Sequence, residues 1–183
     1  MKRAIGLIET KNIIKGISVA DAMLKSANVD LIMAHSVCPG KYFIMVGGDV
    51  GAVQNAVRSG KATGGNENIV DDIVLSNIHP DVFHALSGCS EVKEIKSLGV
   101  IESYSVASAI LAADTAVKSA TVQLIEVRLA RGMGGKSLVT LSGEVGAVTA
   151  AVRAGSNAIQ DSGFLIGDLV IAAPHQGLHK ALF

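Results

Sequence analysis

The sequence has few aromatic residues and no excess charge of either sign. Aromatic residues make up 3% of the 183 positions and tryptophan is absent, so the chain offers little surface on which nucleotide bases could stack. Lysine and arginine together number 16, as do aspartate and glutamate. A net charge of zero provides no long-range attraction for a polyanion. The low aromatic content and the zero net charge therefore argue against nucleic-acid binding.

The sequence also lacks the features of membrane and secreted proteins. No window approaches the roughly 18 uninterrupted apolar residues of a membrane-spanning helix. Glu9 interrupts the first apolar run too early for the core of a signal peptide. Only two cysteines occur, Cys38 and Cys89, without the spacing of a disulfide framework. We therefore expect a cytoplasmic protein of a reducing compartment that does not enter a membrane.

Apolar residues are abundant instead. They make up 49% of the chain, whereas charged residues make up 17%. Small domains have a large surface for their core, so this apolar excess favours further burial between subunits.

An internal repeat organises the whole chain. Three blocks recur in the same order after 93 to 95 positions, namely Gly6–Glu9 as Gly99–Glu102, Asp21–Ala27 as Asp114–Ala120, and Gly48–Val53 as Gly143–Val148. Matches in this order indicate a duplication. We predict two domains, residues 1–94 and 95–183, joined near the charged segment 91–97.

One loop breaks the match between the two halves. The offset grows from 93 to 95 positions between the second and third blocks, where Cys38–Lys41 stands opposite Arg131–Lys136. Loops carry functional differences on similar scaffolds. A specialised function is therefore predicted for this loop.

Periodicity predicts an α+β fold in each half. The expected elements of the first half are a strand at Ala4–Glu9, a helix at Ile17–Ala27, a hairpin of strands Asp30–Ser36 and Tyr42–Val46, a helix at Val50–Ser59, a strand at Ile69–Leu75 and a helix at Pro80–Leu86. Asp49 is the expected N-cap of the second helix and Gly60 its expected end. The second half repeats this order, so each half should form a sheet with helices on one face.

Two glycine-rich segments only resemble nucleotide-binding motifs. Gly134–Ser137 has the end of a phosphate-binding loop, but the required first glycine is replaced by Ala130. Gly47–Gly51 lacks a complete dinucleotide fingerprint and is read as a tight turn between a strand and a helix. Neither segment predicts a nucleotide site.

The ionisable residues do not form a recognisable catalytic set. His79 and His175 occupy equivalent places in the two halves, which favours a shared structural role. For the other histidines, His35, His84 and His179, a structural role is likewise favoured over a metal-ligand role. Glu9 and Glu102 are also repeat equivalents, and no arrangement resembles an activated nucleophile. We therefore predict a protein that is not an enzyme.

The repeated blocks resemble the shell proteins of bacterial microcompartments. The similarity is carried by Ala-Ile-Gly-Leu-Ile-Glu-Thr at Ala4–Thr10, by Asp-x-x-x-Lys-Ser-Ala in the first predicted helix and by Gly-Asp-Val-Gly-Ala-Val in the second. The tandem arrangement resembles the trimeric, double-domain members of this family. The Cys38–Lys41 loop resembles that of the T-type shell proteins of propanediol-utilisation compartments.

This resemblance implies an assembly of flat tiles. Two tandem microcompartment domains, each an antiparallel sheet with packed helices, would form a pseudohexameric homotrimer that packs with other shell proteins around enzymes. Lys25 and Lys118 match the lysine at the tile edge of the family. The family's Arg-Pro-His near the end of each domain is replaced by Asn77-Ile78-His79 and Ala173-Pro174-His175, so the strength of the edge contact is open.

The resemblance also implies a metal centre in the middle of the tile. In the family the hairpin loop lines the central pore, so three copies of Cys38 would meet on one axis. The T-type resemblance implies one [4Fe–4S] cluster per trimer, which transfers electrons across the shell with an encapsulated redox enzyme as partner. Such clusters are usually held by four cysteine thiolates. The residues implied to line the pore are Ser36, Pro39, Gly40, Met133, Gly134 and Gly135.

Three alternatives remain open at this point. Three cysteines and a water could bind Zn²⁺. The pore could instead conduct small metabolites, with Cys38 incidental. From another class, the chain could be an α+β regulator that senses a small molecule and forms no shell. Cys89 is read as a structural or incidental thiol in each case.

Overall fold

The computed structural model describes residues 4–88, 90 and 95–178, which divide into two compact units. The first unit combines the chain up to Ile78 with two later segments, Ser105–Ala107 and Ala130–Lys136. The second contains the other described residues from His79 onward. Cys89, His179 and residues 91–94 of the expected junction lie outside the described residues, so the domain boundary stays a prediction.

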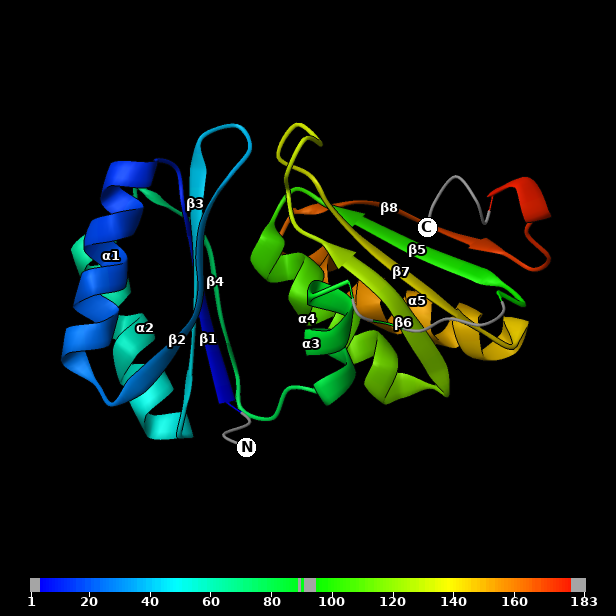
Figure 1. Ribbon diagram of the computed structural model, residues 1–183, viewed down its shortest axis with the longest axis horizontal. Coiled ribbons are helices and arrows are strands. Elements are labelled where there is room, and N and C mark those ends of the chain that lie inside the picture. Colours follow the sequence, from blue (N-terminus) through cyan, green and yellow to red (C-terminus); the bar gives the residue numbers. More distant parts are fainter. Residues whose placement is uncertain (1–3, 89, 91–94, 179–183) are drawn as a thin grey trace. The chain divides into compact units, whose positions relative to one another are not determined.

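A four-stranded antiparallel sheet and two helices form most of the first unit. Its elements are β1 (Ala4–Thr10), α1 (Ile13–Ser26), β2 (Val29–Val37), β3 (Lys41–Gly48), α2 (Val50–Gly64) and β4 (Ile69–Leu75). The strands lie in the order β2-β3-β1-β4, and both helices cover the same face of the sheet (Figure 1). The expected hairpin is confirmed, because β2 and β3 pair from Val29 with Gly48 to Val37 with Lys41.

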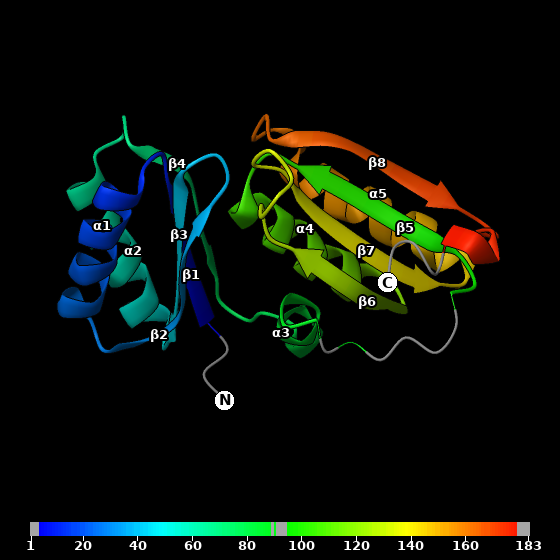
Figure 2. The same cartoon turned by 45° about the horizontal axis from the view of Figure 1, so that its top comes forward.

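The second unit repeats this sheet. Its elements are α3 (Pro80–Leu86), β5 (Leu98–Ser103), α4 (Val106–Ser119, whose first two residues belong to the first unit), β6 (Val122–Arg128), β7 (Ser137–Gly143), α5 (Val145–Gln160) and β8 (Leu165–Ile171). The strand order is β6-β7-β5-β8. Helix α5 packs against β5 and β8, and α3 packs against β6 (Figure 2). The predicted α+β architecture is therefore confirmed in both halves.

The two sheets share their irregularities as well as their order. The register between β1 and β4 shifts at Glu9, and that between β5 and β8 shifts at Glu102. The β2–β3 pairing shifts after Leu31, and the β6–β7 pairing shifts after Leu124. Each bulge in the second sheet lies 93 residues after its counterpart in the first sheet. The duplication therefore extends to the backbone.

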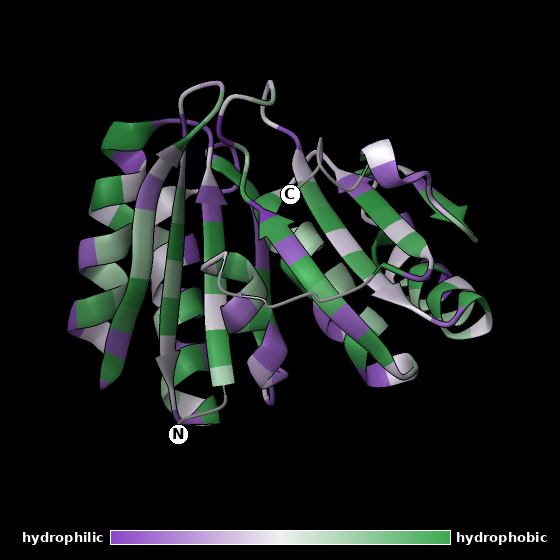
Figure 3. Ribbon diagram, turned by 45° about the vertical axis from the view of Figure 1, so that its right-hand side comes forward, coloured by the Kyte–Doolittle hydropathy of each residue, from purple (hydrophilic) through white to green (hydrophobic). Residues whose placement is uncertain are grey.

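The core of the first unit lies between its sheet and its helices. Apolar residues recur along the strands, shown green in Figure 3. Seven buried residues form a cluster in this layer: Ile8, Val19, Met23, Ile44, Val46, Ala56 and Val57. All seven residues of β1 are buried, and one of them is Glu9. A buried carboxylate requires compensating partners.

The prediction that Gly60 ends the second helix is wrong. Helix α2 continues to Gly64, and Gly65 follows with a positive φ of 72°. Gly60 is buried, and a Cβ atom there would lie 2.6 Å from Ile8 Cδ1 and 2.7 Å from Met23 Cγ. The missing side chain lets α2 approach α1 and β1 closely, so this glycine serves packing rather than termination.

The helix starts also differ in part from expectation. Helix α1 begins at Ile13 rather than Ile17, because Asn12 caps it by accepting a hydrogen bond from the backbone N–H of Lys15 (2.9 Å). Asp49 does occupy the N-cap position of α2, but its side chain makes no capping hydrogen bond. Among the described residues, no helix has both the length and the apolar character needed to cross a bilayer.

Candidate functional site

The loop between β2 and β3 carries Cys38, which has no equivalent cysteine in the second repeat. Cys38 has a free, partly exposed thiol, and Pro39 and Gly40 are exposed beside it. The Gly40 N–H donates a hydrogen bond to the Val37 carbonyl (3.0 Å) and closes the turn. The loop therefore presents one accessible sulfur per chain.

A loop from the second repeat lies directly against this turn. Residues 130–136 belong to the first compact unit, and the Cys38 N–H donates to the Ala130 carbonyl (2.8 Å). Gly135 is buried, and a Cβ atom on it would lie 2.9 Å from Pro39 Cδ and 3.0 Å from the Cys38 oxygen. Three of the predicted central residues, Cys38, Pro39 and Gly135, are thus brought together.

The other predicted central residues surround this contact with different exposure. Ser36 lies near the end of β2 and is exposed, as is Gly134, whereas Met133 is half-buried. The Lys136 N–H donates to the Met133 carbonyl (3.2 Å), which closes the second loop. Their lining of a pore stays a prediction, since it depends on further copies of the chain.

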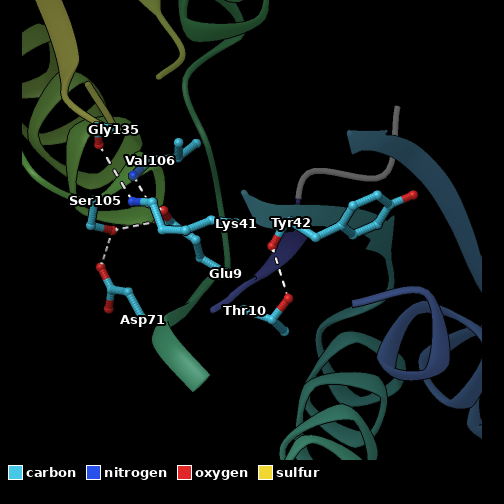
Figure 4. Close-up of polar contacts among 8 residues, drawn as sticks. All are labelled: Glu9, Thr10, Lys41, Tyr42, Asp71, Ser105, Val106 and Gly135. Carbon is cyan, nitrogen blue, oxygen red and sulfur yellow. Dashed lines mark hydrogen bonds and ion pairs between the residues drawn. The ribbon is translucent and has the colours of Figure 1, made fainter. Parts of the chain in front are cut away.

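A buried ion pair links the two loops to the sheet. Lys41, the first residue of β3, forms an ion pair with Glu9 of β1, and the two side chains are 13% and 0% exposed. Lys41 Nζ also lies 3.4 Å from the Gly135 carbonyl (Figure 4). One ammonium group therefore neutralises the buried carboxylate and links it to the loop that lies against the Cys38 turn.

The second oxygen of Glu9 receives hydrogen bonds from the segment at the start of α4. Glu9 Oε2 accepts the Val106 N–H (2.8 Å) and lies 3.1 Å from Ser105 Oγ. Ser105 Oγ is also 2.5 Å from Asp71 Oδ2, and its single hydrogen can serve one carboxylate at a time. A carboxylate is favourable at a helix N-terminus, where the backbone N–H groups point outward. These contacts compensate the burial of Glu9.

The sequence contained a signal for this ion pair that the prediction did not use. Glu9 ends a strand-forming run of apolar residues, and Glu102 stands at the same place in the second half. An acid inside an apolar strand indicates a buried partner of opposite charge. The partner, Lys41, is 32 positions away, and only the β1–β3 pairing brings the two residues together.

The two predicted edge lysines lie near the ends of equivalent helices. Lys25 pairs with Asp21 (2.7 Å) in α1, and Lys118 pairs with Asp114 (2.5 Å) in α4. The acids differ in setting, because the Asp21 side chain is 60% exposed and that of Asp114 is 6% exposed. Asp114 also accepts the His79 N–H (2.7 Å). The edge function of both lysines stays a prediction.

The structural role predicted for His79 and His175 is confirmed. His79 Nδ1 accepts a hydrogen bond from the Asp81 N–H (3.3 Å), and His175 Nδ1 accepts one from the Gly177 N–H (3.1 Å). Each imidazole therefore stabilises a turn two residues further along the chain. His35 and His84 are exposed.

One arginine, two residues before the Ala130–Lys136 loop in the sequence, has a raised pKa. Arg128 ends β6, and its guanidinium donates two hydrogen bonds to Glu126, of 2.9 and 2.6 Å. These hydrogen bonds raise the pKa of Arg128 above its ordinary value. Arginine is positively charged at neutral pH in any case, so the shift does not change its charge there.

A metal cluster cannot be assembled from one copy of the described chain. Within residues 4–88, 90 and 95–178, no three His, Cys, Asp or Glu side chains are grouped to hold a metal ion. The thiol of Cys38 is chemically suited to iron and zinc. It fits a cluster only as one ligand among several contributed by different copies.

Comparison with known sequences identifies relatives of each half and of the whole. The BMC domain matches residues 4–78 and again residues 97–174. The bacterial microcompartment shell protein PduT of Citrobacter freundii is 43% identical over 182 residues, which cover 100% of this chain and 98% of that protein. The shell protein PduA of the same species is 40% identical over 82 residues, or 44% of this chain and 88% of its own length. A single-domain relative thus corresponds to one repeat.

Solved structures agree with this assignment. The crystal structure of a microcompartment protein from Desulfitobacterium hafniense superposes with a TM-score of 0.85 at 46% identity, covering 98% of this chain and 99% of that one. The fused permuted hexameric shell protein MSM0275 from the RMM microcompartment has a TM-score of 0.65 at 25% identity, over 87% and 82% of the two chains.

Proposed function

This chain belongs to the BMC-domain family and is a shell protein of a bacterial microcompartment, and from this premise we propose that three copies form a tile with a [4Fe–4S] cluster at its centre. Its homologues are structural shell proteins, so we propose a structural function with electron transfer added to it. The tile would assemble with other shell proteins and exchange electrons with an encapsulated redox enzyme.

The trimer is supported by the duplication. The relative PduA has about the length of one repeat, and the fused shell protein MSM0275 is described as hexameric. Similar proteins therefore include one with a single repeat and one described as forming a six-part assembly. Homo-oligomers usually have closed cyclic symmetry, and three chains of two equivalent domains provide six equivalent lobes. A residue that occurs in only one repeat then occurs three times around the axis.

The observation that carries the cluster is the position of Cys38 in the loop where the repeats differ. Its thiol is free and partly exposed, and the neighbouring loop of the second repeat is held against it. Three copies would supply three thiolates, which repel one another unless a cation neutralises them. Three iron atoms would then bind Cys38 residues and the fourth another ligand. When bound, such a cluster supplies one-electron redox chemistry.

A metabolite-conducting pore without a cluster is the second candidate. The exposed tips of the two loops carry Gly40 and Gly134, which have no side chains to block an opening. In this alternative Cys38 would be an unligated thiol beside the opening.

Replacement of Cys38 by serine tests the cluster directly. After anaerobic reconstitution with iron and sulfide, the unaltered protein should bind about one [4Fe–4S] cluster per three chains, with visible absorption that bleaches on reduction. The C38S variant should lose this iron and the paramagnetic signal of the reduced cluster, because it removes every proposed thiolate. Its thermal stability should change little, since the side chain is partly exposed.

The other cysteine provides the matched control. The C89S variant should retain iron and sulfide at the same ratio. An iron-free reconstituted protein, or iron that survives in C38S, would contradict the cluster. Metal analysis that finds zinc in place of iron and sulfide would replace it with a zinc site.

A further inference from the structure

We infer that Gly135 is a positioning residue for Cys38: because it has no side chain, the loop of residues 130–136 can lie against the Cys38 turn and fix the place of the thiol. The inference rests on the proposed function, since it concerns how the proposed cluster ligand is held. The residues involved all belong to the first compact unit.

The loop contacts the main chain of Cys38 on both sides of its Cα atom. The Cys38 N–H donates a hydrogen bond to the Ala130 carbonyl (2.8 Å). The Cys38 carbonyl lies against Gly135, where a Cβ atom would come within 3.0 Å of the carbonyl oxygen. The side chain of Cys38 thus leaves the backbone between one group that is bonded and one that is closely packed.

Pro39 makes the packing against Gly135 rigid. A Cβ atom on Gly135 would lie 2.9 Å from Pro39 Cδ, whereas carbon atoms in favourable contact are about 3.5–4.0 Å apart. Pro39 Cδ is part of a ring that includes the backbone nitrogen, so it cannot rotate away. A side chain at position 135 must therefore displace either the Cys38–Pro39 peptide or the loop itself.

The loop is restrained by the sheet as well. Lys41 Nζ lies 3.4 Å from the Gly135 carbonyl oxygen (Figure 4), and the same ammonium group forms the buried ion pair with Glu9 of β1. Because Lys41 is held by a carboxylate on a strand, it resists movement of the loop away from the turn. The displacement caused by a side chain at position 135 is therefore expected to fall on Cys38.

The tip of the same loop offers a matched comparison. Gly132, Gly134 and Gly135 all have positive φ, of 71°, 62° and 88°, so alanine strains the backbone at each of them. A Cβ atom on Gly132 or Gly134 meets nothing within 4 Å. Substitutions at the tip therefore separate the effect of backbone strain from that of the contact with Cys38.

The greater length of the second loop lets it reach the turn. Cys38–Lys41 of the first repeat stands opposite Arg131–Lys136, which is two residues longer. The Lys136 N–H closes the second loop on the Met133 carbonyl (3.2 Å). Ala130, which bonds to Cys38, precedes this closed segment and Gly135 lies within it. The difference in length thus has a structural use, because the two ends of the longer loop contact the two sides of Cys38.

A fixed turn matters for a ligand that several copies share. Groups that bind a metal must be held within about 0.5 Å of the required geometry. In the proposed tile each chain supplies one thiolate, so an error in the turn occurs three times around the axis. The contacts of Ala130 and Gly135 set this position within each chain.

The G135A variant tests the inference without any metal. In a C89S background Cys38 is the only thiol, so its rate of alkylation by iodoacetamide reports on this turn alone. G135A should raise the rate by about 3- to 10-fold, because a segment that loses its contacts opens more often. The control variant G134A should keep the rate of the C89S parent, since its Cβ atom meets nothing within 4 Å.

Reconstitution with iron and sulfide provides the second measurement. G135A should bind less than about half the iron of the C89S parent, because its thiolates no longer converge correctly. Any cluster that forms should have an altered paramagnetic signal when reduced. G134A should match the parent in both respects, whereas an effect of backbone strain alone would appear in both alanine variants.

A shorter loop provides an independent variant should G135A fail to fold. Deletion of Gly132 and Met133 gives the second loop the length of the first, so its ends can no longer contact both sides of Cys38. The same faster alkylation and the same loss of iron are expected. Circular dichroism and thermal unfolding establish that each variant is folded under the conditions of the test.

The two measurements separate this inference from the proposed function. A parent without iron, together with faster alkylation in G135A, would remove the cluster and keep the positioning function of Gly135. Equal alkylation rates in G135A and G134A would overturn the inference, whether or not the parent binds iron. A G135A cluster with the iron content and paramagnetic signal of the parent would also overturn it and would leave the proposed cluster in place.

Discussion

Replacing Lys41 by methionine is expected to lower the free energy of unfolding by about 3–5 kcal/mol, the usual cost of leaving one partner of a buried ion pair alone. The Glu9 side chain is 0% exposed and that of Lys41 is 13% exposed, so water cannot replace the lost ammonium group. Methionine has a similar length and an apolar stem, which limits the loss of packing. Denaturant unfolding at fixed protein concentration measures the change.

An exposed ion pair provides the control for K41M. Lys96 and Glu144 lie 2.5 Å apart, with side chains that are 58% and 75% exposed. The K96M variant should change the free energy of unfolding by less than about 1 kcal/mol. The double variant E9Q/K41M should recover part of the loss because no unpaired charge remains. Equal, small effects of K41M and K96M would show that the buried pair contributes no more than a surface pair.

Replacing Gly16 by alanine is expected to lower the free energy of unfolding by about 2–3 kcal/mol through overpacking. Gly16 is buried in α1, and a Cβ atom there would lie 2.4 Å from Tyr42 Cβ. Tyr42 Cβ is attached directly to β3 and cannot rotate away, so the helix or the strand must move. The loss exceeds the gain in helix propensity of about 1 kcal/mol that alanine otherwise provides. Thermal and denaturant unfolding measure the difference.

The second repeat suggests the compensating change for G16A. The positions equivalent to Gly16 and Tyr42 are Ala109 and Ser137, both buried, so a larger helix residue there faces a smaller strand residue. The double variant G16A/Y42S should therefore lose less stability than the two single effects add up to. Gly51 is the control, because a Cβ atom there meets nothing within 4 Å. A G51A variant as unstable as G16A would contradict the close-packing explanation.

The alternation of strands and helices could be predicted because it depends on local sequence patterns that occur in both repeats. The apolar run of Ala4–Thr10 predicts a strand, and Pro39–Gly40 predicts a turn, whatever the rest of the fold. The structure confirms both. The end of α2 could not be predicted in this way. Whether Gly60 ends a helix or lets it pack closely depends on Ile8 and Met23, which approach it only in the folded unit.

The candidate site was predicted in part for the same reason. The change in repeat offset identified the Cys38 loop, and the structure places the loop of residues 130–136 directly against it. The ion pair of Glu9 and Lys41 was missed because its members meet through strand pairing. The ligands of a cluster would come from different copies, so neither the sequence nor one chain can assemble them.

The first compact unit is not continuous along the chain, and this has a consequence for biosynthesis. Ser105 and Val106 contact Glu9, and Ala130 contacts Cys38, so the unit lacks part of its polar contacts when Ile78 leaves the ribosome. At elongation rates of about 5–20 residues per second, residues 79–136 follow over roughly 3–12 seconds. During that interval the nascent first sheet carries a carboxylate without its final hydrogen-bond donors. A stalled or truncated chain should therefore be a better substrate for chaperones and proteases than its complete apolar core suggests.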